Sequence, residues 1–431
     1  MLRRKITDEL LDWKNRKDRQ CLVVKGARQV GKTYIIERFG RDQYECMIRL
    51  NFIEDPALCG IFDGALTADQ ILSRISLFVK DARLIKGSTL IFLDEIQECP
   101  NARAALKFLA GDPRFDVIAS GSLLGINYKE VPSFPVGFVD HLEMHSLDLE
   151  EFLWARGVTE ELIAELRGYY DRREPVPDVI HQKMMQLFRE YIVIGGMPKV
   201  VDDFVTNLDY RRVRRRQQDI LADYENDIAK YAEGNEKAKA RACFVSIPRH
   251  LAKNYKKFQY SLVEARGTSA KFAGSLMWLF DAGIINFCYN LSSPELPFEG
   301  NVIEDCFKVY MRDTGLLMAM LEDDYQEEIL SGDLGIYKGA IYENVIADLL
   351  TKAGRKLYYF EYRSRLEIDF FIRYQKKATA VEVKSADNTK AKSMNSIIEN
   401  WNVPQGIKLS SRNTGTRENV VCLPIYMVMF L

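Results

Sequence analysis

Short apolar runs alternate with amphipathic stretches over the first 150 residues of the chain. The runs CLVVKG, MIRLNF, STLIFLDE and DVIASGS have the length and composition of buried strands. The stretches between them repeat their apolar positions with the period of a helix. Strands that alternate with helices favour βαβ units and a parallel sheet. We therefore predict an α/β domain over residues 1–150.

The pattern of apolar positions changes twice further along the chain. Helical periodicity dominates from residue 151 to about 330, and strand-like runs nearly vanish there. Residues 236–290 read as helices that end in a short strand pair, with the second helix around Ser269 to Leu279, which is the order of a winged helix. A helix and several strands follow from Tyr337, and the closing run LPIYMVMFL suits a buried strand. The predicted parts are residues 1–150, 151–235, 236–330 and 335–431.

Composition and charge narrow the class of protein. Of the 431 residues 47% are hydrophobic and 28% are charged, as in a globular protein. The 60 basic and 61 acidic residues create no overall field for nucleic acid or a membrane, so a polyanion site must be a local patch. We find no signal peptide and no apolar run near the ~18 residues of a membrane span, and expect a cytoplasmic protein with no membrane partner. The eight cysteines form no CxxC pair, which argues against zinc or a disulfide scaffold.

The segment CLVVKGARQVGKTYIIERF contains a strand, a loop with the pattern GxxxxGK[ST] and a helix, in that order. Its glycines let consecutive backbone amides face a phosphate group, its lysine reaches the β and γ oxygens, and its threonine offers a hydroxyl to magnesium. This predicts binding of ATP with Mg²⁺, although GTP is not distinguished. The predicted contacts are Gly26, Ala27, Arg28, Gln29, Val30, Gly31, Lys32 and Thr33.

A second strand, Leu90 to Leu93, ends in two adjacent carboxylates. We predict that Asp94 holds the magnesium through water and that Glu95 polarises the water that attacks ATP, as P-loop ATPases require.

Further candidates near the phosphates are less specific. Ser120 or Ser122, at the end of the run DVIASGS, would sense the γ-phosphate, but serines at a strand end are also ordinary turn formers. Arg28 and Gln97 are candidate phosphate or water contacts, and solvated loop residues would look the same.

The strings GARQVGKT, LDEIQECP and ASGSLLG resemble a bacterial family of AAA-type ATPases related to archaeal ATPases. The segments FPVG, SLDLEEFL, GGMP and DTGLL continue the likeness in the same order over nearly the whole chain. The family usually has Arg or Lys after FPVG, whereas this chain has Phe138, so an arginine finger is not implied at this position. Oligomeric state stays open. The resemblance also implies a C-terminal domain similar to the PD-(D/E)xK nuclease fold.

Three C-terminal segments carry the acidic residues of such a domain, namely GAIYENVIADLL, EIDFFIRY and VEVKS. Alternation along the strands places Asp369 beside Glu367 on one face, and Glu382 beside Lys384 on another. The resemblance implies that Asp369 and Glu382, completed by Glu343, bind magnesium and that Lys384 stabilises charge on a phosphate. The alternative is a solvated sheet face, the common fate of alternating charges.

Two basic runs are candidate contacts for DNA. RRVRRR at 211–216 has five arginines in six residues, and KNYKKF at 253–258 places lysines beside aromatic residues. Such runs are also typical of salt-bridged helix faces, and YENDIAKYAEGNE supplies acidic partners downstream.

Three functions remain open from the sequence. The first is an ATPase coupled to a nuclease-like domain that acts on DNA or a DNA-bound partner. The second is an ATP-driven switch or signalling protein whose C-terminal domain only binds. The third is a metal-dependent nuclease that ATP gates.

Overall fold

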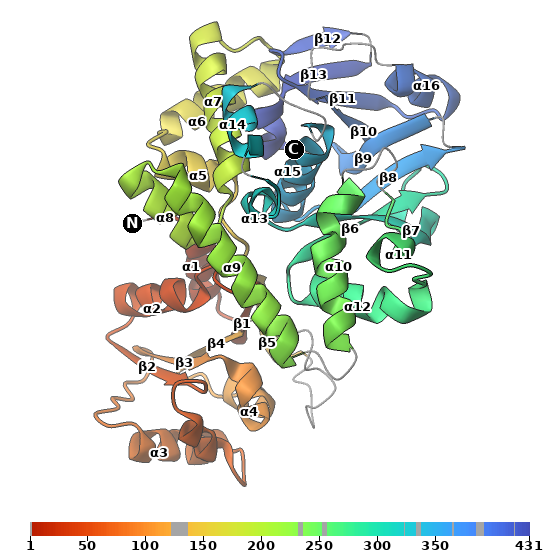
Figure 1. Cartoon of the computed structure of the whole chain (residues 1–431). Helices are drawn as coiled ribbons and strands as arrows, with labels where there is room; N and C mark the ends of the chain where they lie inside the picture. The colour runs from red at the N-terminus through yellow and green to blue at the C-terminus, as the bar shows by residue number, and fades with distance from the viewer. Residues whose placement is uncertain are drawn as a thin grey trace. The chain divides into compact units, whose positions relative to one another are not determined.

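The computed structural model shows a chain of two compact units, one formed by residues 4–146 and the other by residues 147–431 together with 1–3 (Figure 1). The predicted boundaries near residues 235 and 330 lie inside the second unit and stay predictions. The structure describes residues 2–121, 137–231, 236–251, 257–322, 324–332, 338–363, 366–384, 392–417 and 419–431.

The unit of residues 4–146 is built on a parallel sheet, which confirms the α/β prediction for this part of the chain. The described strands pair in the order β2-β3-β4-β1-β5. They are β1 (Cys21–Lys25), β2 (Cys46–Asn51), β3 (Thr89–Asp94), β4 (Asp116–Gly121) and β5 (Val139–Glu143). The helices of this unit are α1 (Ile6–Asn15), α2 (Lys32–Gln43), α3 (Ala68–Phe78) and α4 (Pro100–Ala110), with the 3-10 turns η1 (Pro56–Phe62) and η2 (Ile96–Glu98).

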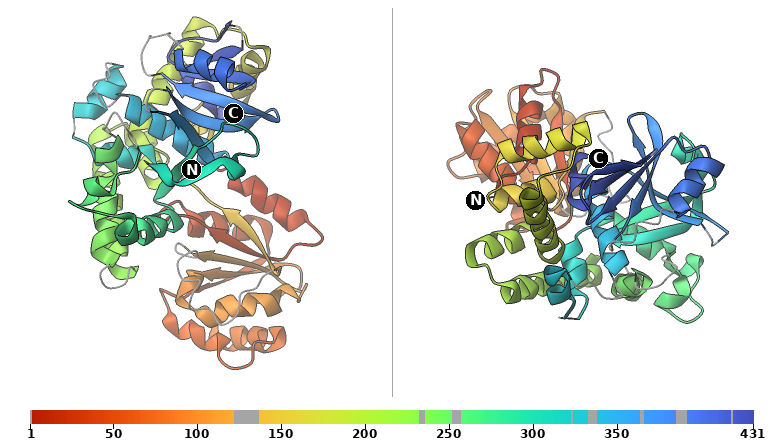
Figure 2. Two further views of the ribbon diagram at one scale, coloured as in Figure 1. Left: turned by 90° about the vertical axis from the view of Figure 1, so that its right-hand side faces the viewer. Right: turned by 90° about the horizontal axis from the view of Figure 1, so that it is seen from above.

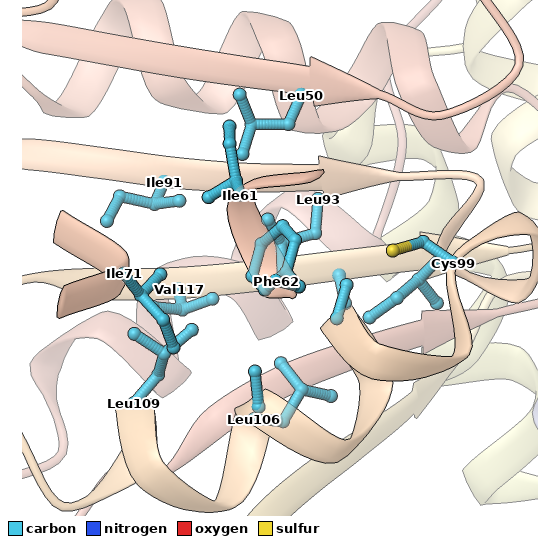
Figure 3. Close-up of a cluster of buried hydrophobic side chains, with 14 of the residues drawn as sticks. Leu50, Ile61, Phe62, Ile71, Ile91, Leu93, Cys99, Leu106, Leu109 and Val117 are labelled. Atoms are coloured by element: carbon cyan, nitrogen blue, oxygen red, sulfur yellow. The ribbon is translucent and has the colours of Figure 1, made fainter. Parts of the chain in front are cut away.

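Helices cover both faces of this sheet because its strands are apolar on both sides. Ile91 and Leu93 of β3 pack into a core with α3 and α4, which Figure 3 shows in close-up. Leu90 and Phe92 point the other way, into a core with α1 and α2. Buried on both faces, the central strands show the continuous hydrophobic runs that predicted them.

The second unit contains a mixed sheet whose eight described strands follow the order β12-β13-β11-β10-β9-β8-β6-β7 (labelled in Figure 1). Figure 2 shows the ribbon from two further sides. They are β6 (Ile285–Leu291), β7 (Val302–Met311), β8 (Leu357–Tyr362), β9 (Leu366–Tyr374), β10 (Lys377–Val383), β11 (Gln405–Ser410), β12 (Gly415–Arg417) and β13 (Val420–Pro424).

Helices precede and cover this sheet. Those before β6 are α5 (Leu149–Ala155), α6 (Glu160–Arg172), α7 (Asp178–Ile194), α8 (Pro198–Asn207), α9 (Tyr210–Tyr231), α10 (Glu236–Leu251), α11 (Tyr260–Val263) and α12 (Ser269–Asp281). Those after it are η4 (Phe298–Asn301), α13 (Thr314–Ala319), α14 (Asp324–Ser331), α15 (Lys338–Lys352), α16 (Lys392–Asn400) and η5 (Ile425–Phe430). Phe371 of β9 packs with Met394 and Ile397 of α16, while the ring of Phe370 packs on Tyr310 of β7.

A strand, β6, does end the range 236–290, but its antiparallel partner β7 lies beyond that range, at residues 302–311. β6 also pairs with β8 in parallel, so strands from the range 236–330 and from the range 335–431 share one sheet. The winged-helix assignment stays a prediction.

The closing run LPIYMVMFL is not a strand over its length, which corrects the expectation. β13 ends at Pro424, and the residues after it form the 3-10 helix η5. Proline has no N–H for a strand ladder, which explains the end of the strand. The side chains of η5 are nevertheless buried, as their apolar character requires: Tyr426 and Met427 are fully enclosed.

No helix in the described part of the chain is both long and apolar enough to cross a membrane.

Candidate functional site

The phosphate-binding loop follows β1 and leads into α2, and both of its glycines are required by geometry. Gly31 has a φ of 93°, a left-handed conformation that residues with a Cβ rarely adopt. A Cβ on Gly26 would lie 2.1 Å from the carbonyl oxygen of Met144. The loop therefore needs glycine at one position for its backbone angle and at the other for a close approach.

Lys32 is folded back onto the loop. Its Nζ donates to the carbonyl oxygens of Gly26, at 2.9 Å, and Ala27, at 2.7 Å. Burial lowers the pKa of Lys32 to about 8, and the nearby carboxylates of Glu95 and Asp94 oppose this shift only in part. The ammonium of Lys32 thus donates to backbone carbonyl oxygens the hydrogen bonds that it would donate to a bound phosphate.

Asp94, at the end of β3, is fully buried and accepts hydrogen bonds from the side chains of four described residues. The hydroxyl of Thr33 is 3.0 Å and that of Ser120 2.6 Å from Oδ1. On Oδ2, Arg49 Nη2 and Asn51 Nδ2 each donate at 2.9 Å. A threonine hydroxyl beside an aspartate fits the ligands that hold magnesium in P-loop proteins.

Glu95 follows in a left-handed conformation, with a φ of 56°. A residue with a Cβ pays a conformational penalty there, and such outliers cluster at functional sites. Nε2 of Gln97 donates to Oε2 of Glu95 at 2.7 Å. The other amide atom of Gln97, Oε1, is buried without a hydrogen-bond partner among the described residues. Gln97 thus contacts Glu95 in this structure, where the sequence suggested a phosphate or a water.

Sequence reasoning missed Arg49 and Asn51, which lie on β2. The parallel register places Asn51 opposite Asp94. Arg49 also forms ion pairs with Glu37, at 3.1 Å, and Glu54, at 2.8 Å. The available signal was the polar character of alternate residues at the carboxyl end of a buried strand, which is where α/β sheets bind ligands.

The other predicted residues of this site occupy different surroundings. Val30 is buried in the core beside α1 and α2, and Gln29 has a φ of 64°. Arg28 is half-buried. Ser122 lies outside the described residues. Phe138 is half exposed, and Nζ of Lys107 lies 5.5 Å from the centre of its ring.

The C-terminal acidic residues come together in the second unit. α15 carries Glu343 and β10 carries Glu382, and both side chains are buried. Asp369 of β9 accepts a hydrogen bond from the backbone N–H of Val383 at 2.8 Å. Nζ of Lys384 lies 2.6 Å from Oε1 of Glu382, so these two residues do share one face. Burial lowers the pKa of Lys384, but the carboxylates of Glu382, Asp369 and Glu343 outweigh it and raise that pKa above its ordinary value.

A lysine that the sequence did not single out lies among these carboxylates. Lys308 of β7 is 1% exposed, and its Nζ is 2.5 Å from Oε1 of Glu367 and 3.8 Å from Oε2 of Glu343. The ammonium also lies 4.6 Å from the centre of the Tyr359 ring. Burial lowers the pKa of Lys308, and the carboxylates of Glu343, Glu367 and Asp369 more than reverse this, so its pKa lies above the ordinary value.

In this structure Glu343, Glu367 and Glu382 are paired with lysine ammonium groups. No three His, Cys, Asp or Glu side chains in the described part of the chain are arranged to hold a metal. An irregularity in the pairing of β8 with β9 also interrupts the expected alternation: Tyr358 pairs with Phe371, whereas Phe360 pairs with Ile368. The metal roles of Glu343, Asp369 and Glu382, and the catalytic role of Lys384, stay predictions.

The segments GGMP and DTGLL lie against each other where the chain enters the second unit. Leu147 donates its N–H to the carbonyl oxygen of Gly196 at 2.7 Å, and the N–H of Gly196 bonds Asp313 at 2.8 Å. Nζ of Lys352, on α15, donates to the carbonyl oxygen of Leu147 at 3.1 Å and pairs with Asp348 at 2.8 Å. These contacts give both segments a structural role and tie Leu147 to the helix that carries Glu343.

Comparison with known protein families assigns the N-terminal part of the chain. Residues 18–153 match the family model described as "AAA domain". Residues 185–327 and 338–427 match two models described as domains of unknown function, DUF8612 and DUF4143. No curated protein matches the chain significantly.

Solved structures of low identity resemble the chain. A Walker-type ATPase of Pyrococcus abyssi is 14% identical, with a TM-score of 0.41 and coverage of 74% of this chain and 96% of that one. The ORC1 protein of Aeropyrum pernix, in complex with DNA, is 13% identical, with a TM-score of 0.30 and coverage of 76% and 92%. DnaA of Aquifex aeolicus, bound to AMPPCP, is 12% identical, with a TM-score of 0.29 and coverage of 64% and 86%.

The family match, the parallel sheet and the loop before α2 all indicate a P-loop ATPase. ATP binding and hydrolysis are the general activity of that class. Residues 18–153 form an AAA-type P-loop ATPase domain.

Proposed function

We propose that the protein is a magnesium-dependent ATP hydrolase. One observation carries the proposal: the first turn of α2 brings the Thr33 hydroxyl to the buried carboxylate of Asp94, and Glu95 directly follows Asp94 at the end of β3. Ser120 donates to the same carboxylate from β4. A phosphate loop, a pair of magnesium ligands and a carboxylate for water are the parts that P-loop hydrolases share.

The loop from Gly26 to Thr33 binds the triphosphate in this proposal. Its backbone N–H groups, at the N-terminus of α2, face the phosphate oxygens. Lys32 exchanges the carbonyl oxygens of Gly26 and Ala27 for oxygens of the β- and γ-phosphates. Thr33 and Asp94 would hold Mg²⁺, which neutralises charge that develops on the phosphate oxygens.

Glu95 supplies the base for hydrolysis. A water oxygen attacks the γ-phosphorus, the bond from that phosphorus to the β,γ-bridging oxygen breaks, and the water proton passes to the carboxylate of Glu95. The products are ADP and inorganic phosphate. The hydrogen bond from Gln97 keeps the carboxylate of Glu95 in one orientation.

A single substitution tests this assignment. Glu95→Gln keeps the shape of the side chain but removes the base, so we expect ATP turnover to fall by about 100-fold or more while ATP still binds. Glu98→Gln, three residues on, is the matched control and should turn over ATP at the parent rate. Unchanged turnover in Glu95→Gln would show that Glu95 is not the base.

We further propose that ATP binding and hydrolysis change the conformation of the protein. In this proposal the protein is an ATP-driven switch whose C-terminal half binds DNA or a DNA-bound partner without cutting DNA. Support comes from Lys308, whose ammonium pairs with Glu367 and lies 3.8 Å from Glu343, one of the carboxylates that a metal-dependent nuclease would need free. The rival is an ATPase coupled to an active nuclease domain. Incubation of plasmid with the protein and Mg²⁺ or Mn²⁺, with and without ATP, separates the two. Cutting that Asp369→Asn abolishes would establish the nuclease.

The arginines of α9 are the candidate contacts to DNA. Arg211 and Arg215 are exposed. Arg212 and Arg216 share Asp203 as an ion-pair partner, at 2.8 and 3.8 Å, which makes them poorer candidates. We expect Arg211→Ala with Arg215→Ala to weaken DNA binding at low salt, because phosphate contacts by basic side chains carry such affinity. Equal gel shifts for this variant and its parent, or no shift by the parent, would remove α9 from the proposal.

A further inference from the structure

The buried ammonium of Lys308 lies where strands and a helix from different parts of the chain converge. β7 supplies the lysine, β9 supplies Glu367 at 2.5 Å, and α15 supplies Glu343 at 3.8 Å. Tyr359 of β8 lies against the ammonium with its ring. The cation of β7 therefore contacts three consecutive elements from a later part of the chain, α15, β8 and β9.

We propose that Lys308 is the fixed cation of the C-terminal acidic cluster, defined as Glu343, Glu367, Asp369 and Glu382, and that the cluster holds Lys308 in place of a divalent metal ion. The inference rests on the non-cutting output proposed above and is independent of ATP hydrolysis.

The charges of the cluster support this role. Glu343 and Glu382 are buried, while Glu367 and Asp369 are partly exposed. Buried carboxylates require a positive partner, since burial of an unpaired charge is strongly unfavourable. A covalently attached lysine supplies that partner at any concentration of metal. A divalent ion that entered beside it would be repelled by the ammonium and would have to displace it from Glu367 and Glu343.

Glu382, another carboxylate of the cluster, is paired with a different lysine through one of its two oxygens. Oε1 of Glu382 is paired with Lys384 at 2.6 Å. Its other oxygen, Oε2, is buried and has no hydrogen-bond partner among the described residues. Glu382 therefore retains one oxygen available to a cation once Lys308 no longer neutralises the cluster. This predicts that removal of the lysine charge creates a metal site.

The experiment measures Mn²⁺ binding to the full chain without nucleotide, by the paramagnetic resonance signal of free Mn²⁺. The contribution of the cluster is the difference between each protein and its Asp369→Asn derivative, so that ions bound at Asp94 cancel. We expect no difference for the parent chain. Lys308→Met should bind Mn²⁺ at the cluster at least tenfold more tightly than the parent, and Mn²⁺ should raise its melting temperature. Lys308→Arg, which keeps the charge, is the matched control and should behave as the parent.

A second variant covers the case in which Lys308→Met does not fold. Lys308→Met combined with Glu367→Gln removes one positive and one negative charge and leaves Glu343, Asp369 and Glu382. It should gain the same Mn²⁺ binding. The proposal is overturned if the parent binds Mn²⁺ that Asp369→Asn or Glu382→Gln removes, or if the folded lysine variants gain none.

The experiments distinguish a failure of the proposed function from a failure of the role of Lys308. A parent chain that binds no DNA and no partner, or that hydrolyses no ATP, contradicts the switch and leaves the Mn²⁺ result standing. Mn²⁺ bound by the parent at the cluster contradicts the role of Lys308, even where ATP hydrolysis and DNA binding are as proposed.

Discussion

Nη2 of Arg49 lies 2.9 Å from Oδ2 of Asp94 and neutralises the carboxylate that the proposed mechanism assigns to magnesium. The arginine comes from the neighbouring strand and is held by Glu37 and Glu54 as well. Asp94 is buried, so this ion pair compensates a charge that water does not reach.

Replacement of Arg49 should therefore destabilise the nucleotide-free protein. We expect Arg49→Ala to lower the free energy of unfolding by about 2–4 kcal/mol, because one member of a buried pair is left alone. Arg38→Ala is the control: its partner Asp42 is exposed, at 3.3 Å, and such pairs contribute about 1 kcal/mol or less. Urea unfolding measures both. Saturating Mg-ATP should restore more stability to Arg49→Ala than to the parent, and equal losses in the two variants would contradict the role of Arg49.

Lys32 should take up a proton when ATP binds in alkaline solution. Burial lowers its pKa to about 8, so the free protein loses this proton as the pH rises through 8. Phosphate oxygens favour the charged ammonium, so ATP binding at pH 9 should take up close to one proton, whereas binding at pH 6.5 should take up none at this group. Calorimetry in two buffers of different ionisation enthalpy measures the uptake. Lys32→Arg stays charged and should show none at either pH.

The same shift determines how stability depends on pH. The folded state of the free protein binds the Lys32 proton less tightly than the unfolded state does, because the folded pKa is about 8 and the ordinary value is 10.5. The unfavourable contribution of Lys32 is therefore fully present below pH 8 and is relieved as the pH rises from there toward 10.5. Lys32→Met should remove this pH dependence from the unfolding free energy.

Gln97 should act on hydrolysis through Glu95. We expect Gln97→Ala to lower the turnover number by about tenfold and to leave the dissociation constant of ATP within about twofold, because a misoriented base affects the chemical step. In a Glu95→Gln background the same change should have no further effect, since the carboxylate that it orients is gone. Additive losses in the double variant would mean that Gln97 acts elsewhere.

Gly196 should tolerate no side chain. A Cβ there would lie 2.1 Å from the carbonyl oxygen of Leu147, so we expect Gly196→Ala to lower the free energy of unfolding by more than about 2 kcal/mol. Gly300→Ala is the control, because nothing lies within 4 Å of its added Cβ. That change should be neutral or stabilising by up to about 1 kcal/mol. A similar loss from both substitutions would contradict the close approach at Leu147.

The parallel sheet of the first unit and the residues proposed to hold magnesium were accessible from sequence because the patterns that predict them are local. Thr33 lies in the first turn of the helix after the phosphate loop and Asp94 ends a strand, each within a recognisable string, and the structure joins them at 3.0 Å. Arg49 and Asn51 were not found, because their role depends on which strand pairs with β3 and in which register. Pairing between strands is a property of the fold and not of either segment.

In the C-terminal half, too, the local motifs were predictable from sequence and the contacts between distant segments were not. The helix with Glu343 and the strands with Asp369 and Glu382 were predicted, and β9 and β10 do pair. Lys308 was not singled out, because it belongs to a strand in an earlier part of the chain and only the shared sheet brings it to Glu367. We propose that this long-range contact changes the chemistry that the local motif predicts.

The chain passes from the first unit to the second between two fixed points. Met144 donates to the carbonyl oxygen of Lys25, at the start of the phosphate loop, at 2.8 Å, and Leu147 is bonded to Gly196 at 2.7 Å. Consecutive Cα atoms are about 3.8 Å apart, so the three steps from Met144 to Leu147 span no more than roughly 11 Å. This segment is too short to form a flexible linker. The short backbone between these anchors therefore limits how far Met144 and Leu147 can move apart while both hydrogen bonds are kept.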